Sequence, residues 1–294
     1  MFFLQSSERT IEFSRCTWWV GYVSNNPKKK LYFSDVAKRT IGNKLTNIQF
    51  EQVEIFENSF NFTHKEQQKN SKNLVRLIDI YDQVMGVKIY QVGKGKPKQT
   101  SFEVDNDIFI SPEKLDENYW FFIDSGVKRY VLAQKETKFI KYGEWLAEPR
   151  NLKYFTNDKI VIREVVNPRL FSCFIDFPAV VKNTNAVIIQ KNPEYSLKFL
   201  LGILNSNYFD FYLKKEASKI NNNSFPSINS HLLKNFLIPQ LPPEQQKPFE
   251  KLVDEILTAK KAGKNTEELE GEIDKLVYKL YELTAAEIEV VEGR

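Results

Sequence analysis

The stretch that decides the fold is Ser196-Leu-Lys-Phe-Leu-Leu-Gly-Ile-Leu-Asn-Ser-Asn-Tyr-Phe-Asp-Phe-Tyr-Leu-Lys-Lys215. Its apolar side chains fall on nearly all sides of a helical wheel, and a serine such as Ser196 is a good N-terminal cap. A helix that is apolar all round has to be buried. The pattern therefore predicts one helix over residues 196–215 at the centre of the core.

Short apolar runs elsewhere in the chain are typical of strands, because they are rich in β-branched and aromatic residues or alternate apolar with polar positions. In chain order these runs are Cys16–Val23, Val87–Val92, Tyr119–Ile123, Lys159–Arg163 and Ala186–Ile189. Gly93–Thr100 is expected to be a lysine-rich loop, and Asn221–Pro226 is expected to be a second loop.

Two amphipathic helices are expected after Leu241-Pro-Pro243. Apolar residues at 249, 252, 253, 256 and 257, and again at 269, 273, 276, 277 and 280, follow helical spacing. Gly263-Lys-Asn265 separates the two helices, and Thr266 is the expected N-cap of the second. Thr284-Ala-Ala-Glu287 is a capping box that opens a last short helix. Such a hairpin has to bury its apolar stripes against another surface.

These elements predict a mixed α+β fold, with a β-rich middle, a buried central helix and a C-terminal helical hairpin. We divide the chain into an N-terminal α/β segment (1–73), a middle domain (74–240) and the hairpin (241–294). The length of 294 residues and an apolar share of 42% support a sizeable core. Disorder is excluded for most of the chain.

Composition also excludes several classes of protein. Two cysteines, Cys16 and Cys173, exclude a disulfide framework and a zinc site built on three or four cysteines. Two histidines, His64 and His231, argue against a multi-histidine metal centre, so no metal site is expected. The sequence shows neither a signal peptide nor a run of about 18 apolar residues. We expect a soluble, cytoplasmic protein with no membrane partner.

The charge of the chain is unevenly distributed. Residues from Leu241 to Arg294 include eight Lys and Arg against thirteen Asp and Glu, whereas the preceding part has 34 basic and 25 acidic residues. A basic body with an acidic helical tail fits a module that binds a polyanion and carries an appendage for a protein partner. The alternative is that both parts have ordinary solvated faces.

Motifs of common enzymes are absent from the sequence. The chain has no P-loop, no His-Glu-x-x-His and no Gly-x-Ser-x-Gly. The Asn/Asp-Pro-Pro-aromatic motif that holds a flipped base for amino-methylation is also missing. Asp124 followed by Glu136-Thr-Lys138 mimics the carboxylates and lysine of a magnesium-dependent nuclease, which makes cleavage of DNA an alternative function.

Basic residues interleaved with aromatic residues and amides give a stronger signal in the middle of the chain. Arginine reads guanine bidentately, amides read adenine, and lysine or arginine neutralises phosphate. The residues that we expect to bind DNA are Lys94, Lys96, Lys98, Arg129, Lys141, Arg150, Arg163, Arg169, Asn183 and Asn185. The lysines of the Gly93–Gln99 loop are assigned to phosphate, and the arginines and asparagines to bases. The structural alternative is that such a residue pairs with a buried acid, for example Arg163 with Glu164 or Glu144.

Several stretches resemble one known family. They are Tyr90–Thr100, Val127–Tyr130, Tyr142–Arg150, Lys159–Arg163, Leu200–Ser206, Phe225–Ile228, Pro243–Gln246 and Glu272–Tyr281. Together they are similar to the TaqI-like C-terminal specificity domain of adenine-specific DNA methyltransferases and type IIG restriction-modification enzymes. The last two stretches also resemble helices of type I specificity subunits. The resemblance covers roughly residues 74–293.

The resemblance implies sequence-specific binding of double-stranded DNA, with 74–240 as the target-recognition domain of an adenine-N6 methyltransferase or restriction enzyme. Catalysis would belong to a methyltransferase or endonuclease domain in the same or a partner chain. That parent enzyme would use S-adenosylmethionine, and magnesium for cleavage, whereas this chain would bind no cofactor and have no catalytic residue. The hairpin would pack onto the partner or a second copy. A structural assembly module acting through these helices is a further alternative.

Overall fold

A computed structural model of the chain describes residues 10–13, 19–22, 32–35, 74–165, 169–220 and 230–293; for the first three stretches and for 217–220 only the backbone is described. The chain divides into two compact units, Met1–Asn70 and Ser71–Arg294. In the first unit, β1 (Thr10–Phe13), β2 (Trp19–Tyr22) and β3 (Tyr32–Asp35) form an antiparallel sheet in the order β1-β2-β3. β2 confirms a strand within the predicted run 16–23, whereas the predicted loop 221–226 lies outside the described residues.

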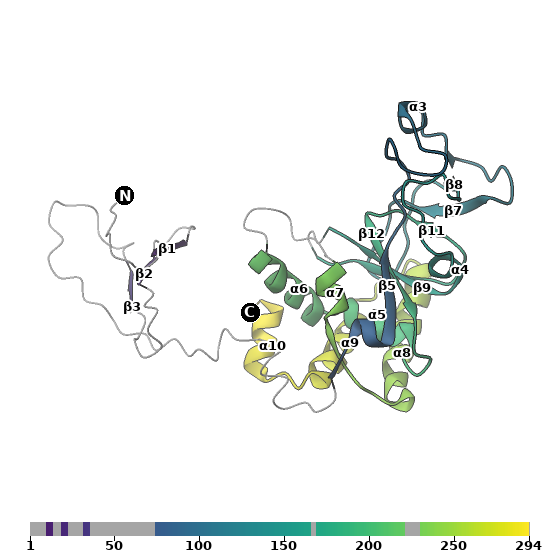
Figure 1. Ribbon diagram of the computed structural model, residues 1–294. Coiled ribbons are helices and arrows are strands. Elements are labelled where there is room, and N and C mark those ends of the chain that lie inside the picture. Colours follow the sequence, from purple (N-terminus) through teal and green to yellow (C-terminus); the bar gives the residue numbers. More distant parts are fainter. Residues whose placement is uncertain are drawn as a thin grey trace. The chain divides into compact units, whose positions relative to one another are not determined.

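The second unit is built around two four-stranded sheets (Figure 1). The main sheet has the antiparallel order β10 (Ser172–Ile175), β9 (Lys159–Arg163), β12 (Asn185–Gln190) and β5 (Tyr81–Met85). The second sheet has the order β11 (Val180–Val181), β7 (Tyr119–Ile123), β8 (Phe139–Lys141) and β6 (Ile110–Ser111). β13 (Leu237–Pro239) pairs with β4 (Leu74–Arg76). The predicted strands 119–123, 159–163 and 186–189 are confirmed.

The main sheet is buried on both faces, which explains why its central strands are apolar throughout. Ile160 and Ile162 of β9 pack on the side of the helices, whereas Val161 between them packs against the second sheet. This alternation follows from the two-residue period of a strand. The unit therefore has three layers, with α5 (Leu197–Leu204), α8 (Pro243–Lys261) and α9 (Glu267–Leu280) on one side of the main sheet and β7, β8 and β11 on the other (Figure 1).

The central helix is broken where the sequence predicts continuity. The structure has α5, and then α6 (Asn207–Ile220), with Asn205 and Ser206 between them. Ser196 caps α5 as predicted, because its hydroxyl accepts from the Lys198 N–H at 3.1 Å. At the break, the Ser206 hydroxyl donates to the Ile203 carbonyl at 2.7 Å and accepts from the Phe209 N–H at 3.2 Å. These local bonds replace helical ones, so the prediction of one helix over 196–215 is wrong at this point.

The side chain of Asn205 ties the break to the edge of the main sheet. Its Oδ1 accepts from the backbone N–H and the hydroxyl of Ser172, and its Nδ2 donates to the Ser172 carbonyl at 3.1 Å. Both residues are buried. Asn205 thus satisfies backbone groups on β10 that a neighbouring strand would otherwise bind.

The predicted strand Val87–Val92 is extended chain rather than a strand. Val87 donates its N–H to Val181 at 2.8 Å, whereas Lys88 exchanges backbone hydrogen bonds with Glu148. Successive residues therefore bind two different segments, so no continuous ladder with one partner is formed. An alternation of apolar residues does not distinguish these two cases.

The C-terminal hairpin packs onto the central helix of the same chain. Phe249 of α8 meets Phe199 edge-on, with ring centroids 5.2 Å apart. Tyr281, which follows α9, lies 4.4 Å from the ring of Tyr208 and donates its hydroxyl to the Leu237 carbonyl. The predicted boundary after residue 240 thus falls inside one compact unit.

The ends of these helices match the predictions, with one exception. Thr284 and Glu287 form the expected capping box of α10 (Ala285–Glu292). Thr266 occupies the N-cap position of α9, but its hydroxyl donates to Glu270 and makes no cap. Asn265 takes that role, since its Oδ1 accepts from the Glu267 N–H at 2.8 Å.

The remaining helices are short connections: α2 (Leu77–Ile80), α3 (Ser101–Asp105), α4 (Lys153–Thr156) and α7 (Ser230–Lys234). Among the described helices, none is long and apolar enough to cross a membrane.

Replacing Asn205 by alanine tests the link between the helix break and the sheet. We expect Asn205→Ala to lower the free energy of unfolding by about 3 kcal/mol, because it leaves the buried N–H and hydroxyl of Ser172 without their acceptor. Urea denaturation followed by circular dichroism measures the change. The exposed Asn106→Ala is the control, and equal stability of the two variants would contradict this role.

Candidate nucleic-acid interface

The predicted lysine loop is an ordered, closed turn that presents its charges outward. The N–H of Gly93 donates to the Gln99 carbonyl at 2.9 Å, and the N–H of Gln99 donates to the Lys94 carbonyl at 2.7 Å. Gly93 and Gly95 have left-handed backbones, with φ of 80° and 84°. A side chain at Gly95 would lie 2.3 Å from the Trp145 carbonyl, so glycine is required there.

All three predicted lysines of this loop, Lys94, Lys96 and Lys98, are exposed. Lys96 lies 3.8 Å from Glu144 in a pair whose side chains are both largely exposed, so the pair contributes little. Lys141 belongs to the neighbouring segment, with its Nζ 5.4 Å from the ring of Trp145. The structure thus brings the three loop lysines and Lys141, all of which are predicted to bind DNA, to one region.

Four other predicted residues gather at one end of the main sheet, where β5 and β9 end and β12 begins. Arg163 donates to the Val165 carbonyl and lies 4.5 Å from the ring of Phe171. Arg150 donates to the Met85 carbonyl at 3.0 Å and to Glu148 at 2.9 Å. Asn183 is half-buried in the turn before β12.

Asn185 is the fourth of these, and it is only 2% exposed. Its carbonyl accepts from the Gly86 N–H, and its side chain donates to Thr184. Asn185 therefore holds the turn in place, whereas Arg150, Arg163 and Asn183 lie nearer to solvent.

Arg129 and Arg169, which the sequence predicts as base-reading residues, lie in the interior. Both donate to the carbonyl of Asn205, Arg129 through Nε at 3.0 Å and Nη2 at 2.6 Å, and Arg169 through Nη2 at 3.1 Å. Arg129 also forms an ion pair with Glu270 of α9. This placement corrects the prediction, because an arginine engaged in such a buried network cannot reach a base edge without breaking it.

The two acids of this network respond differently to burial. Burial raises the pKa of Glu270, but Arg129, Thr266 and Lys260 together lower it further, so that it lies below its ordinary value of 4.5. For Asp274 burial prevails, and its pKa is raised. The difference follows from geometry, since Glu270 has the direct ion pair whereas Asp274 lies 4.0 Å from Arg129.

The predicted nuclease residues also come together, but as an ion-pair cluster. Lys138 Nζ lies 2.9 Å from Asp124 and 3.7 Å from Glu136. Because the lysine already neutralises the carboxylates, a magnesium ion would have to displace it. Within the described residues, no group of three or more His, Cys, Asp or Glu side chains is placed to hold a metal ion.

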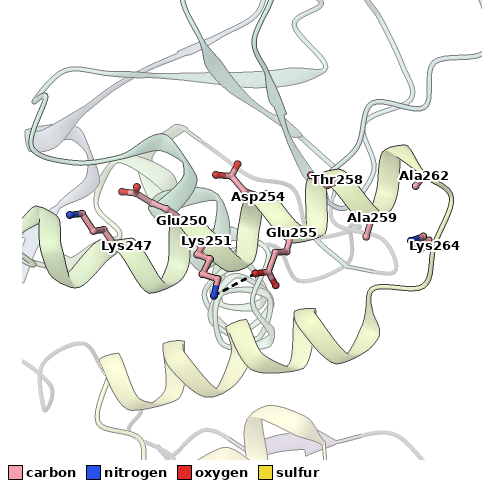
Figure 2. Close-up of a pocket in the computed structure, with 9 residues that line it drawn as sticks. All are labelled: Lys247, Glu250, Lys251, Asp254, Glu255, Thr258, Ala259, Ala262 and Lys264. Carbon is pink, nitrogen blue, oxygen red and sulfur yellow. Dashed lines mark ion pairs between the residues drawn. The ribbon is translucent and has the colours of Figure 1, made fainter.

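A second surface is the outer face of α8, which Figure 2 shows. It is a shallow groove lined by Lys247, Glu250, Lys251, Asp254, Glu255, Thr258, Ala259, Ala262 and Lys264. Lys251 lies 3.9 Å from Glu255, and Asp254 lies 2.6 Å from Lys198. Positive and negative groups alternate here, so this face lacks the uniform positive charge that a phosphate backbone attracts.

Comparison with protein families gives one match: residues 123–238 match the TaqI-like C-terminal specificity domain. This part of the chain is therefore similar to a TaqI-like specificity domain. The match runs from the last residue of β7 into β13, and therefore covers the main sheet apart from β5, together with the broken central helix. It confirms the resemblance that the sequence motifs predict. A comparison with curated proteins gave no match.

Several solved structures are similar to the chain. The type IIL restriction-modification enzyme MmeI in complex with DNA is 12% identical, with a TM-score of 0.49 over 72% of this chain and 35% of that chain. The HsdS subunit from Thermoanaerobacter tengcongensis is 19% identical, with a TM-score of 0.39 over 71% and 44%. The type IIG restriction endonuclease BpuSI is 13% identical, with a TM-score of 0.42 over 74% and 33%. The chain spans less than half the length of these proteins.

Two residues near these surfaces, Lys128 and Gln99, are not predicted from the sequence. Lys128 is exposed, with its Nζ 5.7 Å from the ring of Phe171, next to Arg163. The sequence signal for Lys128 as a DNA-binding residue is its position beside Arg129, in the family-like stretch Val127–Tyr130. Gln99 is buried beneath the lysine loop, and nothing in its sequence context distinguishes it from an exposed glutamine.

The buried ion pair gives a pH-dependent prediction. The pKa of Glu270 is lower in the folded state than its ordinary value of 4.5, so its ionisation stabilises the fold above pH 4.5 and this contribution is lost as the pH falls through the lowered value. We expect Glu270→Gln to lose about 3 kcal/mol at neutral pH, because Arg129 remains buried without its partner. The wild type and the variant begin to converge below pH 4.5 and become equal only once the pH has fallen through the lowered pKa of Glu270.

Urea denaturation in a pH series from neutrality to below 4.5 measures this effect. The exposed Glu268→Gln on the same helix is the matched control. A constant difference between Glu270→Gln and the wild type across the series would contradict the proposed role of the ionised carboxylate.

Proposed function

We propose that the protein binds double-stranded DNA in a sequence-specific manner, as the target-recognition part of a restriction-modification system that acts on adenine. The family match to a specificity domain carries this proposal. The placement of basic residues supports it, since lysines are exposed on an ordered loop and an arginine and amide cluster lies at one end of the main sheet. The loop lysines would bind the phosphate backbone of the DNA and set the register of the protein on the duplex, while the arginine and amide cluster would read base edges.

Catalysis is proposed to belong to a methyltransferase or endonuclease domain, in the same polypeptide or a partner chain, as in adenine-specific methyltransferases and type IIG enzymes. S-adenosylmethionine, and magnesium for cleavage, would be held by that domain. This chain contributes site selection by its own residues. The proposed setting is the cytoplasm, where the DNA of a cell without a nucleus lies.

The alternative functions are less well supported. The nuclease alternative depends on Asp124 and Glu136, and the structure pairs both with Lys138. The assembly alternative depends on the hairpin, and its apolar stripes are buried within the chain itself. The charged outer face of α8 is the part of the hairpin that we assign to a protein partner (Figure 2). Deleting residues 241–294 would expose the apolar side chains of α5 to solvent. Point substitutions are therefore required to test the outer face of α8.

The proposed function is tested by the binding of labelled duplexes over a range of salt concentrations. We expect one preferred sequence, and a logarithm of affinity that falls linearly with the logarithm of salt concentration. The triple variant Lys94→Ala, Lys96→Ala, Lys98→Ala should reduce the magnitude of this slope by about 3, since each phosphate contact contributes roughly 0.9. Fluorescence polarisation measures both quantities.

The matched control removes the same charge from the other side of the unit. Lys247→Ala, Lys251→Ala, Lys264→Ala should leave the slope and the preferred sequence unchanged, because these lysines lie on the mixed-charge face of α8. Equal effects of the two triple variants would show that net charge alone governs binding. Absence of a preferred sequence, with the catalytic partner present, would contradict target recognition.

A further inference from the structure

We propose that Gln99 is a positioning residue for DNA binding, which fixes the lysine loop in the shape that presents Lys94, Lys96 and Lys98 to the phosphodiester backbone. The inference rests on the proposed function and adds a residue to it. The loop lies before residues 123–238, so the family match does not assign it.

The side chain of Gln99 uses its whole amide to hold three backbone segments together. It is 3% exposed. Its Nε2 donates to the Ile89 carbonyl at 2.8 Å and to the Trp145 carbonyl at 2.7 Å, while its Oε1 accepts from the Gln91 N–H at 2.8 Å. A buried amide with these three bonds keeps both ends of the loop at fixed positions on the segment that carries Trp145.

The rest of the loop is fitted to the same segment. The N–H of Lys96 donates to the Glu144 carbonyl at 2.8 Å, and Gly95 approaches the Trp145 carbonyl too closely for any side chain. Ile89, which accepts from Gln99, also accepts from the N–H of Ala147 at 3.0 Å. The loop is therefore held by backbone atoms and by one glutamine.

The lysine side chains take no part in this scaffold. Throughout the described ranges, the only ion pair or hydrogen bond of their ammonium groups is the exposed pair of Lys96 with Glu144. Their charges are thus available to a ligand while the loop keeps its shape. Three exposed lysines on an ordered loop fit a polyanion, because the backbone of the loop needs no further ordering when the lysines meet phosphates.

A double-mutant cycle separates positioning from general stability. Gln99→Met keeps the length of the side chain but removes its hydrogen bonds. We expect it to weaken binding of the preferred duplex roughly tenfold, because the three lysines are no longer held in positions from which they contact the DNA phosphates at the same time. In the background of Lys94→Ala, Lys96→Ala, Lys98→Ala, the same substitution should change the affinity less than about twofold, since nothing remains to be positioned.

Gln246 provides a matched control within the same chain. It is also buried, donates to the carbonyls of Glu194 and Leu241, and accepts from the Ser196 N–H, but it lies in the helical layer. Gln246→Met should lower the melting temperature and leave the DNA affinity of the folded protein unchanged. Fluorescence polarisation gives the affinities, and circular dichroism verifies that each variant is folded.

Two outcomes would overturn the inference: a Gln99→Met protein with wild-type affinity, or a Gln99→Met effect that persists undiminished without the lysines. If Gln99→Met does not fold, Gly95→Ala distorts the same loop where it packs against the Trp145 carbonyl, and it takes the place of Gln99→Met in the cycle. A wild-type chain that binds no duplex would instead contradict the proposed function itself, so the two failures are distinguishable.

Discussion

The packing of the second unit depends on the hydrogen bonds that the carbonyl of Asn205 accepts from two largely buried arginines. Because α5 ends there, this carbonyl is free of a helical partner and lies at the negative end of the helix. Arg129 and Arg169 both donate to it. The two cations require compensation in the interior, which Glu270 and Asp274 of α9 supply. One broken helix thus couples the strand layers to the C-terminal hairpin.

This network divides the basic residues of the chain into two functions. The arginines with buried acidic partners stabilise the core, whereas the lysines of the Gly93–Gln99 loop remain exposed on a fixed backbone. Burial decides between these roles, since a buried guanidinium has to be paired and an exposed ammonium is available to a ligand. The structural support for the DNA-binding proposal therefore comes from the position of basic residues in the fold rather than from their number.

The hairpin has one face in the core and one exposed face. Its apolar stripes complete the core around α5, so it is an integral part of the unit that contains residues 123–238. Its outer face carries alternating charges and differs from the lysine loop in the ligand it suits (Figure 2). The proposed DNA-binding side and the proposed partner-facing side can coexist on one unit because different layers supply them.

The sequence by itself determined the elements that depend on local patterns: the two-sided apolar strands Lys159–Arg163 and Ala186–Ile189, the Ser196 cap, the amphipathic hairpin, the lysine loop and the family resemblance. Periodicity and capping depend on residues a few positions apart, so they can be recognised in the sequence. Only the tertiary structure decided that Asn205 breaks the central helix, that Arg129 pairs with Glu270 and that Gln99 anchors the loop. Each of these depends on contacts between residues far apart in sequence, and no local pattern specifies which distant carbonyl or carboxylate a polar side chain will meet.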